Sequence, residues 1–269
     1  LDANTTGEYN TALGYAALGA STTGSNNVAI GSGAGDAATT ASYNTSVGAG
    51  ALSAATTGQY NTVVGYNAMD AITTGVEAVA IGSLALTQAS GSSNVALGHK
   101  AGENVTTGTN NVLLGKETGR TGAPGGNITT GDNSVCIGNA NIASANIQVD
   151  WTIASDKRDK TDVSQLDLGL DFINQLEPVT YRWDKRSKYS DDQSVTPDGT
   201  HKEEQLEGGF LAQDVEVIEN QYGYKTDDKT NLITKLSEDG EMYGITYSKL
   251  VPMLTKAIQE LSAKVEDLE

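Results

Sequence analysis

A short internal repeat constrains the fold of the first half of this 269-residue chain more than any other feature does. Its copies start 17 residues apart, with one spacing of 16 and one of 23. They read NTALG, NVAIG, NTSVG, NTVVG, AVAIG, NVALG, NVLLG and SVCIG, and begin at residues 10, 27, 44, 61, 78, 94, 111 and 134. The triplet TTG precedes six of these copies at the same distance, at 5–7, 22–24, 56–58, 73–75, 106–108 and 129–131. Such a period predicts stacked units that contact mainly their neighbours.

Each repeat predicts one coil of a β structure. A short run rich in β-branched residues that closes on glycine is typical of a strand followed by a tight turn, and the recurrent asparagines favour hydrogen bonds to backbone at turns. Strands about 4.8 Å apart would place eight coils in a column roughly 40 Å long. A column so thin and so poor in aromatic residues is too small to be stable alone, so we expect a homo-oligomer.

The distribution of charge predicts a domain boundary near residue 154. Residues 1–153 contain only twelve charged side chains, whereas six of the ten residues in ASDKRDKTDV, at 154–163, are charged. We therefore divide the chain into a repeat domain at 1–140, a connector at 141–154 and a second domain at 155–269. The net charge of −17 argues against binding nucleic acid through a basic surface.

The second domain has a mixed α and β pattern. We predict a helix at 164–176, a strand at 179–183, a polar mobile loop at 185–205, and a strand that enters a helix at 208–220. A final helix at 248–269 would have Ser248 as N-cap and Pro252 in its first turn. Its apolar residues alternate by four and three, which predicts a coiled-coil seam between copies of the chain. The seam consists of Leu254, Ile258, Leu261, Val265 and Leu268.

Several short motifs are similar to known ligand-binding sequences but do not support a ligand site. GSGAG at 31–35 lacks a surrounding βαβ unit, and GKET at 115–118 lacks the glycine that a phosphate-binding loop needs. His99 and His201 are isolated, and Cys136, between two aliphatic residues, is expected to be a buried apolar residue. We expect no metal and no cofactor. No apolar run is long enough to span a membrane, so we expect no membrane insertion. Because Leu1 falls within a repeat, we expect the chain to be a fragment.

The repeats at about 5–140 resemble the head repeats of trimeric autotransporter adhesins, which also occur in phage tail fibres. That resemblance implies a mainly β half, a left-handed parallel β-roll within a trimer. The later segments SDKRDKTDV (155–163), LEPVTYRW (176–183), GFLAQDVEVI (209–218) and YSKLVPMLTKAIQELSAKVEDLE (247–269) resemble, in order, the self-cleaving intramolecular chaperone domain of phage tail spikes and fibres. This second resemblance implies an α+β chaperone domain that ends in a trimerising helix.

The chaperone resemblance also implies a cleavage chemistry. In that family the chain is cut immediately before a serine, and a lysine five residues later completes a Ser–Lys dyad. The matching positions here are Ala154, Ser155 and Lys160, with Asp156 and Arg158 as candidates for support. Some relatives carry a histidine where this chain has Glu207. A lysine can act as a base only when neutral, so the dyad would require Lys160 to be desolvated and its neighbouring aspartates turned away.

The sequence thus predicts a tail-fibre or tail-spike fragment, assembled in the host cytoplasm and carried on the virion. Its C-terminal domain would drive homotrimer assembly, set the register of the β-roll and then cut the Ala154–Ser155 bond as a single-turnover serine autoprotease. Its partners would be its own copies and a host cell-surface receptor. The main alternative is a structural or adhesive trimeric fibre that is never cut. A bacterial surface adhesin and a polysaccharide-degrading spike are weaker alternatives.

Overall fold

The computed structural model describes residues 1–190 and 193–268, and the chain divides into two compact units. The first unit combines Leu1–Ile142 with Lys185–Pro197 and Ser237–Met242. The second combines Ala143–Asp184, Asp198–Leu236 and Tyr243–Glu269. Two polar segments of the C-terminal half therefore belong to the same compact unit as the repeats.

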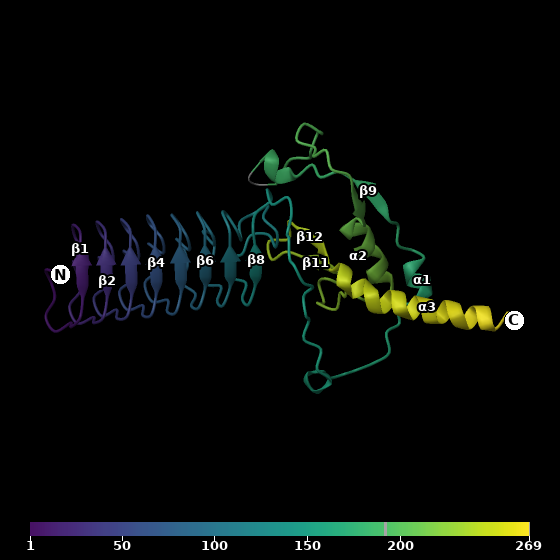
Figure 1. The fold of residues 1–269 in the computed structure, drawn as a ribbon, viewed down its shortest axis with the longest axis horizontal. Helices are drawn as coiled ribbons and strands as arrows, with labels where there is room; N and C mark the ends of the chain where they lie inside the picture. The colour runs from purple at the N-terminus through teal and green to yellow at the C-terminus, as the bar shows by residue number, and fades with distance from the viewer. Residues whose placement is uncertain (191–192, 269) are drawn as a thin grey trace. The chain divides into compact units, whose positions relative to one another are not determined.

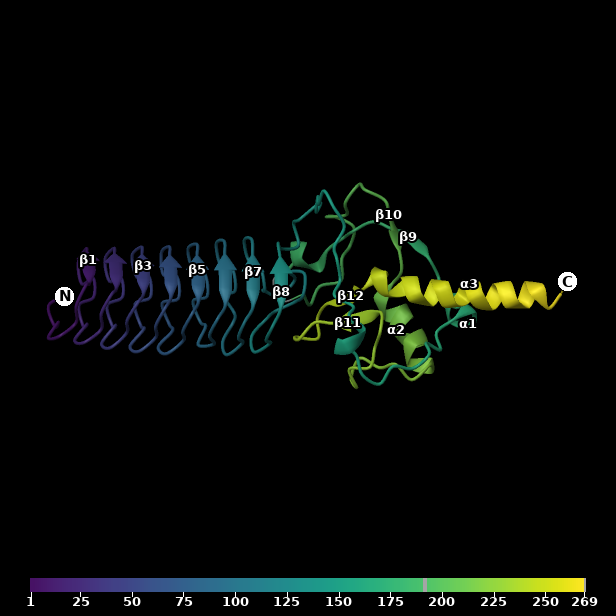
Figure 2. The same cartoon turned by 60° about the horizontal axis from the view of Figure 1, so that its bottom comes forward.

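Every repeat forms one three-residue strand of a parallel sheet (Figures 1 and 2). Each strand pairs in parallel with the next, so that Thr11 lies opposite Val28 and Val112 opposite Val135. This arrangement confirms the stacked coils predicted from the repeat. The strands are β1 Thr11–Leu13, β2 Val28–Ile30, β3 Thr45–Val47, β4 Thr62–Val64, β5 Val79–Ile81, β6 Val95–Leu97, β7 Val112–Leu114 and β8 Val135–Ile137.

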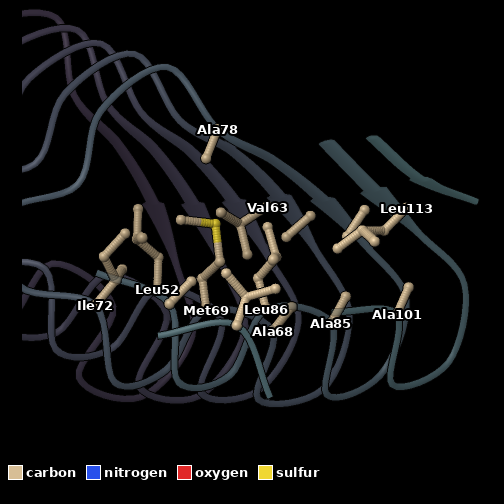
Figure 3. Close-up of a cluster of buried hydrophobic side chains, with 14 of the residues drawn as sticks. Leu52, Val63, Ala68, Met69, Ile72, Ala78, Ala85, Leu86, Ala101 and Leu113 are labelled. Carbon is tan, nitrogen blue, oxygen red and sulfur yellow. The ribbon is translucent and has the colours of Figure 1, made fainter. Parts of the chain in front are cut away.

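The interior of the roll is narrow because each strand contributes only its middle side chain. In β4 and β7 these are Val63 and Leu113, both fully buried. Leu52, Met69 and Leu86 pack against them from the other side of the coil (Figure 3). Cys136 takes the middle position of β8 and is buried, as the sequence predicted, and burial raises the pKa of its thiol. The small residues of the repeats are thus a packing requirement.

An asparagine ladder joins successive coils inside the roll. The side-chain Oδ1 of Asn44 accepts hydrogen bonds from the backbone N–H of Asn61, at 3.0 Å, and from its Nδ2, at 3.1 Å. The Nδ2 of Asn44 donates in turn to the carbonyl of Gly58, at 2.8 Å. Such bonds satisfy buried backbone groups at the turn. In the fifth coil Ala78 replaces the asparagine, and the ladder is interrupted there.

The glycine that closes each strand is required by its neighbours. Gly31 has φ +135°, and a Cβ there would lie 2.5 Å from the carbonyl oxygen of Gly48 in the next coil. Gly65 has φ +142° and the same close approach to Gly82. Any side chain at these positions would push adjacent coils apart, since real Cβ contacts are longer than this.

The second unit is a small α+β domain. Its core consists of Leu168, Phe172, Val215, Ile233, Leu250 and Met253. The strands are β9 Val179–Tyr181, β10 Glu207–Gly209, β11 Thr234–Leu236 and β12 Tyr243–Ile245, and the helices are α1 Leu170–Ile173, α2 Ala212–Gln221 and α3 Leu250–Glu266. β9 pairs with β10 and β11 with β12, both antiparallel. The predicted strand at 179–183 and the strand–helix at 208–220 are confirmed.

Two expectations about helices were wrong in detail. The helix predicted at 164–176 is reduced to α1, because its N-cap Gly169 has φ −113° and ψ −138° and the helix cannot extend back through it. Ser248 does not cap the final helix: a 3-10 turn, η3 Tyr247–Lys249, precedes α3, whose N-cap is Lys249 without a side-chain bond. Among its described residues the polar segment 185–205 contains one 3-10 turn, η2 Arg186–Lys188, while 191–192 lie outside them.

Candidate self-cleavage site

A single 3-10 turn brings the two predicted dyad residues together. The turn, η1 Lys157–Asp159, is capped by the Asp156 side chain, which accepts a hydrogen bond from the backbone N–H of Arg158 at 2.9 Å. The backbone N–H of Lys160 then donates to the carbonyl of Lys157, at 3.3 Å. The chain therefore turns back on itself between residues 155 and 160. As a result the Nζ of Lys160 lies 2.5 Å from the Oγ of Ser155.

The exposure of this pair matters for the chemistry. A general base must accept the proton of the Ser155 hydroxyl, which a lysine can do only as the neutral amine. Both side chains are exposed. A lysine amine becomes a base when burial disfavours its charged form, so the single chain has the contact but lacks the desolvation that the reaction requires.

The carboxylate of Asp156, adjacent to Ser155 in sequence, forms an ion pair with another residue. The Arg158 guanidinium pairs with Asp156, with its Nη2 at 2.6 Å from Oδ2. This hydrogen bond, with a smaller contribution from the Arg158 backbone N–H, holds the pKa of the Asp156 carboxyl below its usual value. Among residues 1–190 and 193–268, no carboxylate forms an ion pair with Lys160. Arg158 thus draws one negative charge away from the dyad.

Glu207, which stands where the resemblance would place a histidine, makes no contact with the Ser155–Lys160 pair. Glu207 lies on β10 opposite Tyr181 of β9. No hydrogen bond or ion pair joins Glu207 to Ser155 or Lys160 in the described chain. His99 is exposed, and the described residues contain no group of three metal-ligating side chains.

The predicted seam of α3 is an exposed stripe. The helix buries a different face, that of Leu250, Met253 and Ala257, within the domain core. The exposed fractions of the seam residues range from 45 to 87 %, for Leu254, Ile258, Leu261, Val265 and Leu268. A row of apolar side chains that stays this exposed within the described chain is typical of a surface that assembles.

The connector at 141–154 carries a strand-like alternation that was not among the predictions. Ile147, Val149, Trp151 and Ile153 alternate with polar residues, the period of a strand with one apolar face. All four side chains are exposed, by 53 to 73 %. Within the described chain, residues 143–155 make no backbone–backbone hydrogen bond. The alternation alone would have identified the segment as one that needs a partner strand.

Comparison with known proteins places the site at the edge of a family domain. Residues 155–224 match the sequence model of the family Peptidase_S74, described as chaperone of endosialidase. The first matched residue is Ser155. No curated protein and no solved structure matches the chain. No described helix is long and apolar enough to cross a membrane. The match and the β-solenoid together fit a tail fibre with a C-terminal endosialidase-type chaperone domain, which confirms the resemblance.

Proposed function

We propose that this chain is part of a phage tail fibre or spike whose C-terminal domain assembles three copies, sets the register of the β-roll and then cuts the Ala154–Ser155 bond. The observation that carries the proposal is the 2.5 Å contact between Lys160 Nζ and Ser155 Oγ at the first residue of the family match. The family name supports a self-cleaving peptidase, and its description supports a role in assembly.

The need for an assembly domain follows from the repeats. Nearly identical coils specify their register weakly, because a slip by one coil preserves most contacts. In the roll, outward-facing aliphatic side chains such as Leu13, Leu97 and Ile137 remain exposed by 49 to 66 %. These surfaces favour association of several rolls. A C-terminal helix that trimerises first would raise the local concentration of the three rolls and align their ends.

The proposed cleavage is an acyl shift followed by hydrolysis. The Ser155 Oγ attacks the Ala154 carbonyl carbon while the neutral Lys160 amine takes the hydroxyl proton. The bond from that carbon to the Ser155 nitrogen breaks, the nitrogen takes up a proton, and Ala154 becomes an ester on Oγ. Water then hydrolyses the ester, which leaves a carboxylate on Ala154 and restores the Ser155 hydroxyl. No cofactor or metal takes part.

Assembly would act as the trigger for this reaction. In one chain both residues of the dyad are exposed to water. A second copy that covers the connector and its apolar row would remove water from Lys160 and favour the neutral amine. Cleavage would then follow assembly. It would leave the fibre without its assembly domain, and hence protected by a kinetic barrier.

The finished roll would remain on the virion, after assembly in the host cytoplasm, and would contact a host cell-surface receptor. The alternative, a trimeric fibre that keeps its C-terminal domain, shares every feature except the reaction. The experiment that separates them is denaturing electrophoresis with intact mass on freshly expressed chain, beside Ser155→Ala and Lys160→Ala. We expect fragments 1–154 and 155–269 from the natural sequence and intact chain from both variants. An uncut natural chain would favour the alternative.

A further inference from the structure

The coils of the roll are joined by a second ladder, at the TTG triplets. The backbone N–H groups of Thr56 and Thr57 both donate to the carbonyl of Thr73 in the next coil, at 3.0 and 3.2 Å. The Thr56 hydroxyl donates to the same oxygen. The pattern continues to Thr106, whose N–H donates to Thr129 at 2.8 Å. Most coils of the described roll thus use the carbonyl oxygen of the following one.

The triplet Thr129–Gly131 has no following coil, yet four of its donors are paired with one carboxylate. The Glu238 carboxylate accepts from the N–H of Thr130 at 3.0 Å and from the N–H of Gly131 at 2.8 Å. It also accepts from the hydroxyls of Thr129, at 3.2 Å, and Thr130, at 2.6 Å. Beside it, the Asp239 carboxylate accepts from the N–H of Asn127, at 2.7 Å. These carboxylates occupy the place of the carbonyls of a further coil.

Segment 237–242 is folded so as to present these two carboxylates. The Ser237 hydroxyl donates to Asp239 Oδ1 at 2.5 Å and accepts from the N–H of Met242 at 2.9 Å. The N–H of Gly240, with φ +74°, closes the turn onto the Ser237 carbonyl at 3.0 Å. Arg186 donates to Glu241 and so ties this turn to segment 185–197 of the same compact unit. The carboxylates are therefore preorganised.

The position of the contact is specified by the one long repeat. The 23-residue spacing before the last strand inserts extra residues, and Gly126 within them has φ +74°. A Cβ at Gly126 would lie 2.5 Å from the Cβ of Ser237, so the turn fits closely over this glycine. The shorter repeats contain no such insertion. The turn therefore has one matching coil in the roll.

We infer that segment 237–242 caps the roll by imitating a ninth coil, with Glu238 and Asp239 in place of the carbonyl groups that the next coil would supply. The cap marks the coil at which the ladder ends. This inference deepens one part of the proposed function, the setting of the register of the β-roll, and rests on that proposal. The contact itself does not depend on cleavage. Partial burial alone raises the pKa of the Glu238 carboxyl, but the hydrogen bonds from Thr130, Gly131 and Thr129 together hold it below its ordinary value.

The cap can be tested by hydrogen exchange in the full chain carrying Ser155→Ala, so that the segment stays attached. We expect Glu238→Gln and Glu238→Ala to speed exchange at the amides of Thr130 and Gly131 by about fivefold, and Asp239→Asn to do so at Asn127. Glu204→Gln, at an exposed position, is the matched control. The amide of Thr106, which donates to a carbonyl, should not change in any variant.

Unchanged exchange at Thr130 and Gly131 in both Glu238 variants would overturn the cap. A chain of natural sequence that remains uncut would count against the proposed cleavage alone, since the exchange comparison does not use it. The two failures are therefore distinguishable. Glu238→Gln retains the size of the side chain, which keeps the test valid if Glu238→Ala folds poorly.

Discussion

At the scale of single residues, the chemistry at Ser155 depends on which charges stand beside Lys160. Arg158 holds the Asp156 carboxylate in an ion pair and keeps it from the lysine. We predict that Arg158→Ala slows cleavage roughly tenfold, because a freed carboxylate near Lys160 would favour the ammonium form, which cannot act as a base. The rate is measured as the appearance of fragment 155–269 after synthesis.

The double variant Asp156→Asn with Arg158→Ala provides the control. It removes the carboxylate as well as its partner, so we expect a cleavage rate within about threefold of the natural sequence. If the double variant is as slow as Arg158→Ala alone, Arg158 acts by another route, such as a direct contact with the Ala154 carbonyl.

The sequence predicted the Ser155–Lys160 contact but not the residues that carry the most hydrogen bonds. The pair was expected from the resemblance to the chaperone family, whose serine and lysine are likewise five residues apart. Glu219 is different: it is fully buried and accepts from the N–H groups of Leu232, Ile233 and Thr234 at 2.8 to 3.0 Å. In the sequence it is one acidic residue among many, because nothing local distinguishes a structural carboxylate from a solvated one.

At the scale of the elements, the interrupted asparagine ladder offers a stabilising substitution. The equivalent positions in neighbouring coils hold Asn61 and Asn94 at 0 to 1 % exposure, so the site accommodates an amide. We predict that Ala78→Asn restores the ladder and stabilises the roll by roughly 1 kcal/mol, which corresponds to an apparent Tm about 2–4 °C higher at a fixed scan rate.

Ala80→Asn is the matched control, two residues further along the chain. Ala80 is the middle residue of β5 and points into the apolar interior, so an amide there would be buried without partners. It should lower the apparent Tm by several degrees, since an unpaired buried amide costs roughly 1–3 kcal/mol. Equal effects of the two substitutions would contradict the ladder as an energetic feature.

Acid should release the cap on the last coil. The folded pKa of Glu238 is depressed, so its contacts contribute stability above the unfolded value of about 4.3 and lose it as the pH falls through the lower folded value. Asp239, whose pKa is also lowered despite partial burial, titrates in the same direction. We predict constant protection factors at Thr130 and Gly131 from about pH 8 to 5 and a decline below about pH 4, relative to Thr106. Glu238→Gln should abolish that decline.

How well each element could be predicted depended on how regular its pattern is. The eight strands follow from a period that repeats from residue 10 to residue 138, so each copy supports the others. The helix at 164–176 rested on one apolar stripe, and a single glycine at 169 was enough to shorten it. The prediction of Ser248 as the N-cap of α3 was wrong for a similar local reason. Ser248 lies within the 3-10 turn at 247–249, which precedes the helix.

At the scale of the whole molecule, composition predicted a boundary near residue 154, but it did not predict that later segments fall in the compact unit of the repeats. Segments 185–197 and 237–242 fall in the compact unit of the repeats, and the bonds from Thr130 to Glu238 join residues 108 apart. Both segments are polar and have no periodicity. A contact made by carboxylates to backbone donors leaves no apolar pattern for sequence reasoning to detect.

Assembly is the prediction that belongs to the whole molecule. In the Ser155→Ala background, where cleavage cannot change the mass, we expect sedimentation equilibrium to give three times the 27.9 kDa of one chain. Ile258→Asp places a charge in the middle of the exposed stripe of α3, where Ile258 is 67 % exposed and therefore adds little to the fold of its own domain. A buried unpaired charge is costly, so this variant should sediment as a monomer with an unchanged helix signal.

Gln259→Asp is the control for that variant, because residue 259 is also exposed but lies on the far side of α3 from the stripe. It should remain trimeric. If Ile258→Asp is a trimer as well, the stripe is not the contact, and the exposed rows of the roll would have to hold the copies together alone. If the Ser155→Ala chain with an unaltered stripe sediments as a monomer, a single chain must desolvate Lys160 by itself. The proposed link between assembly and cleavage would then fail.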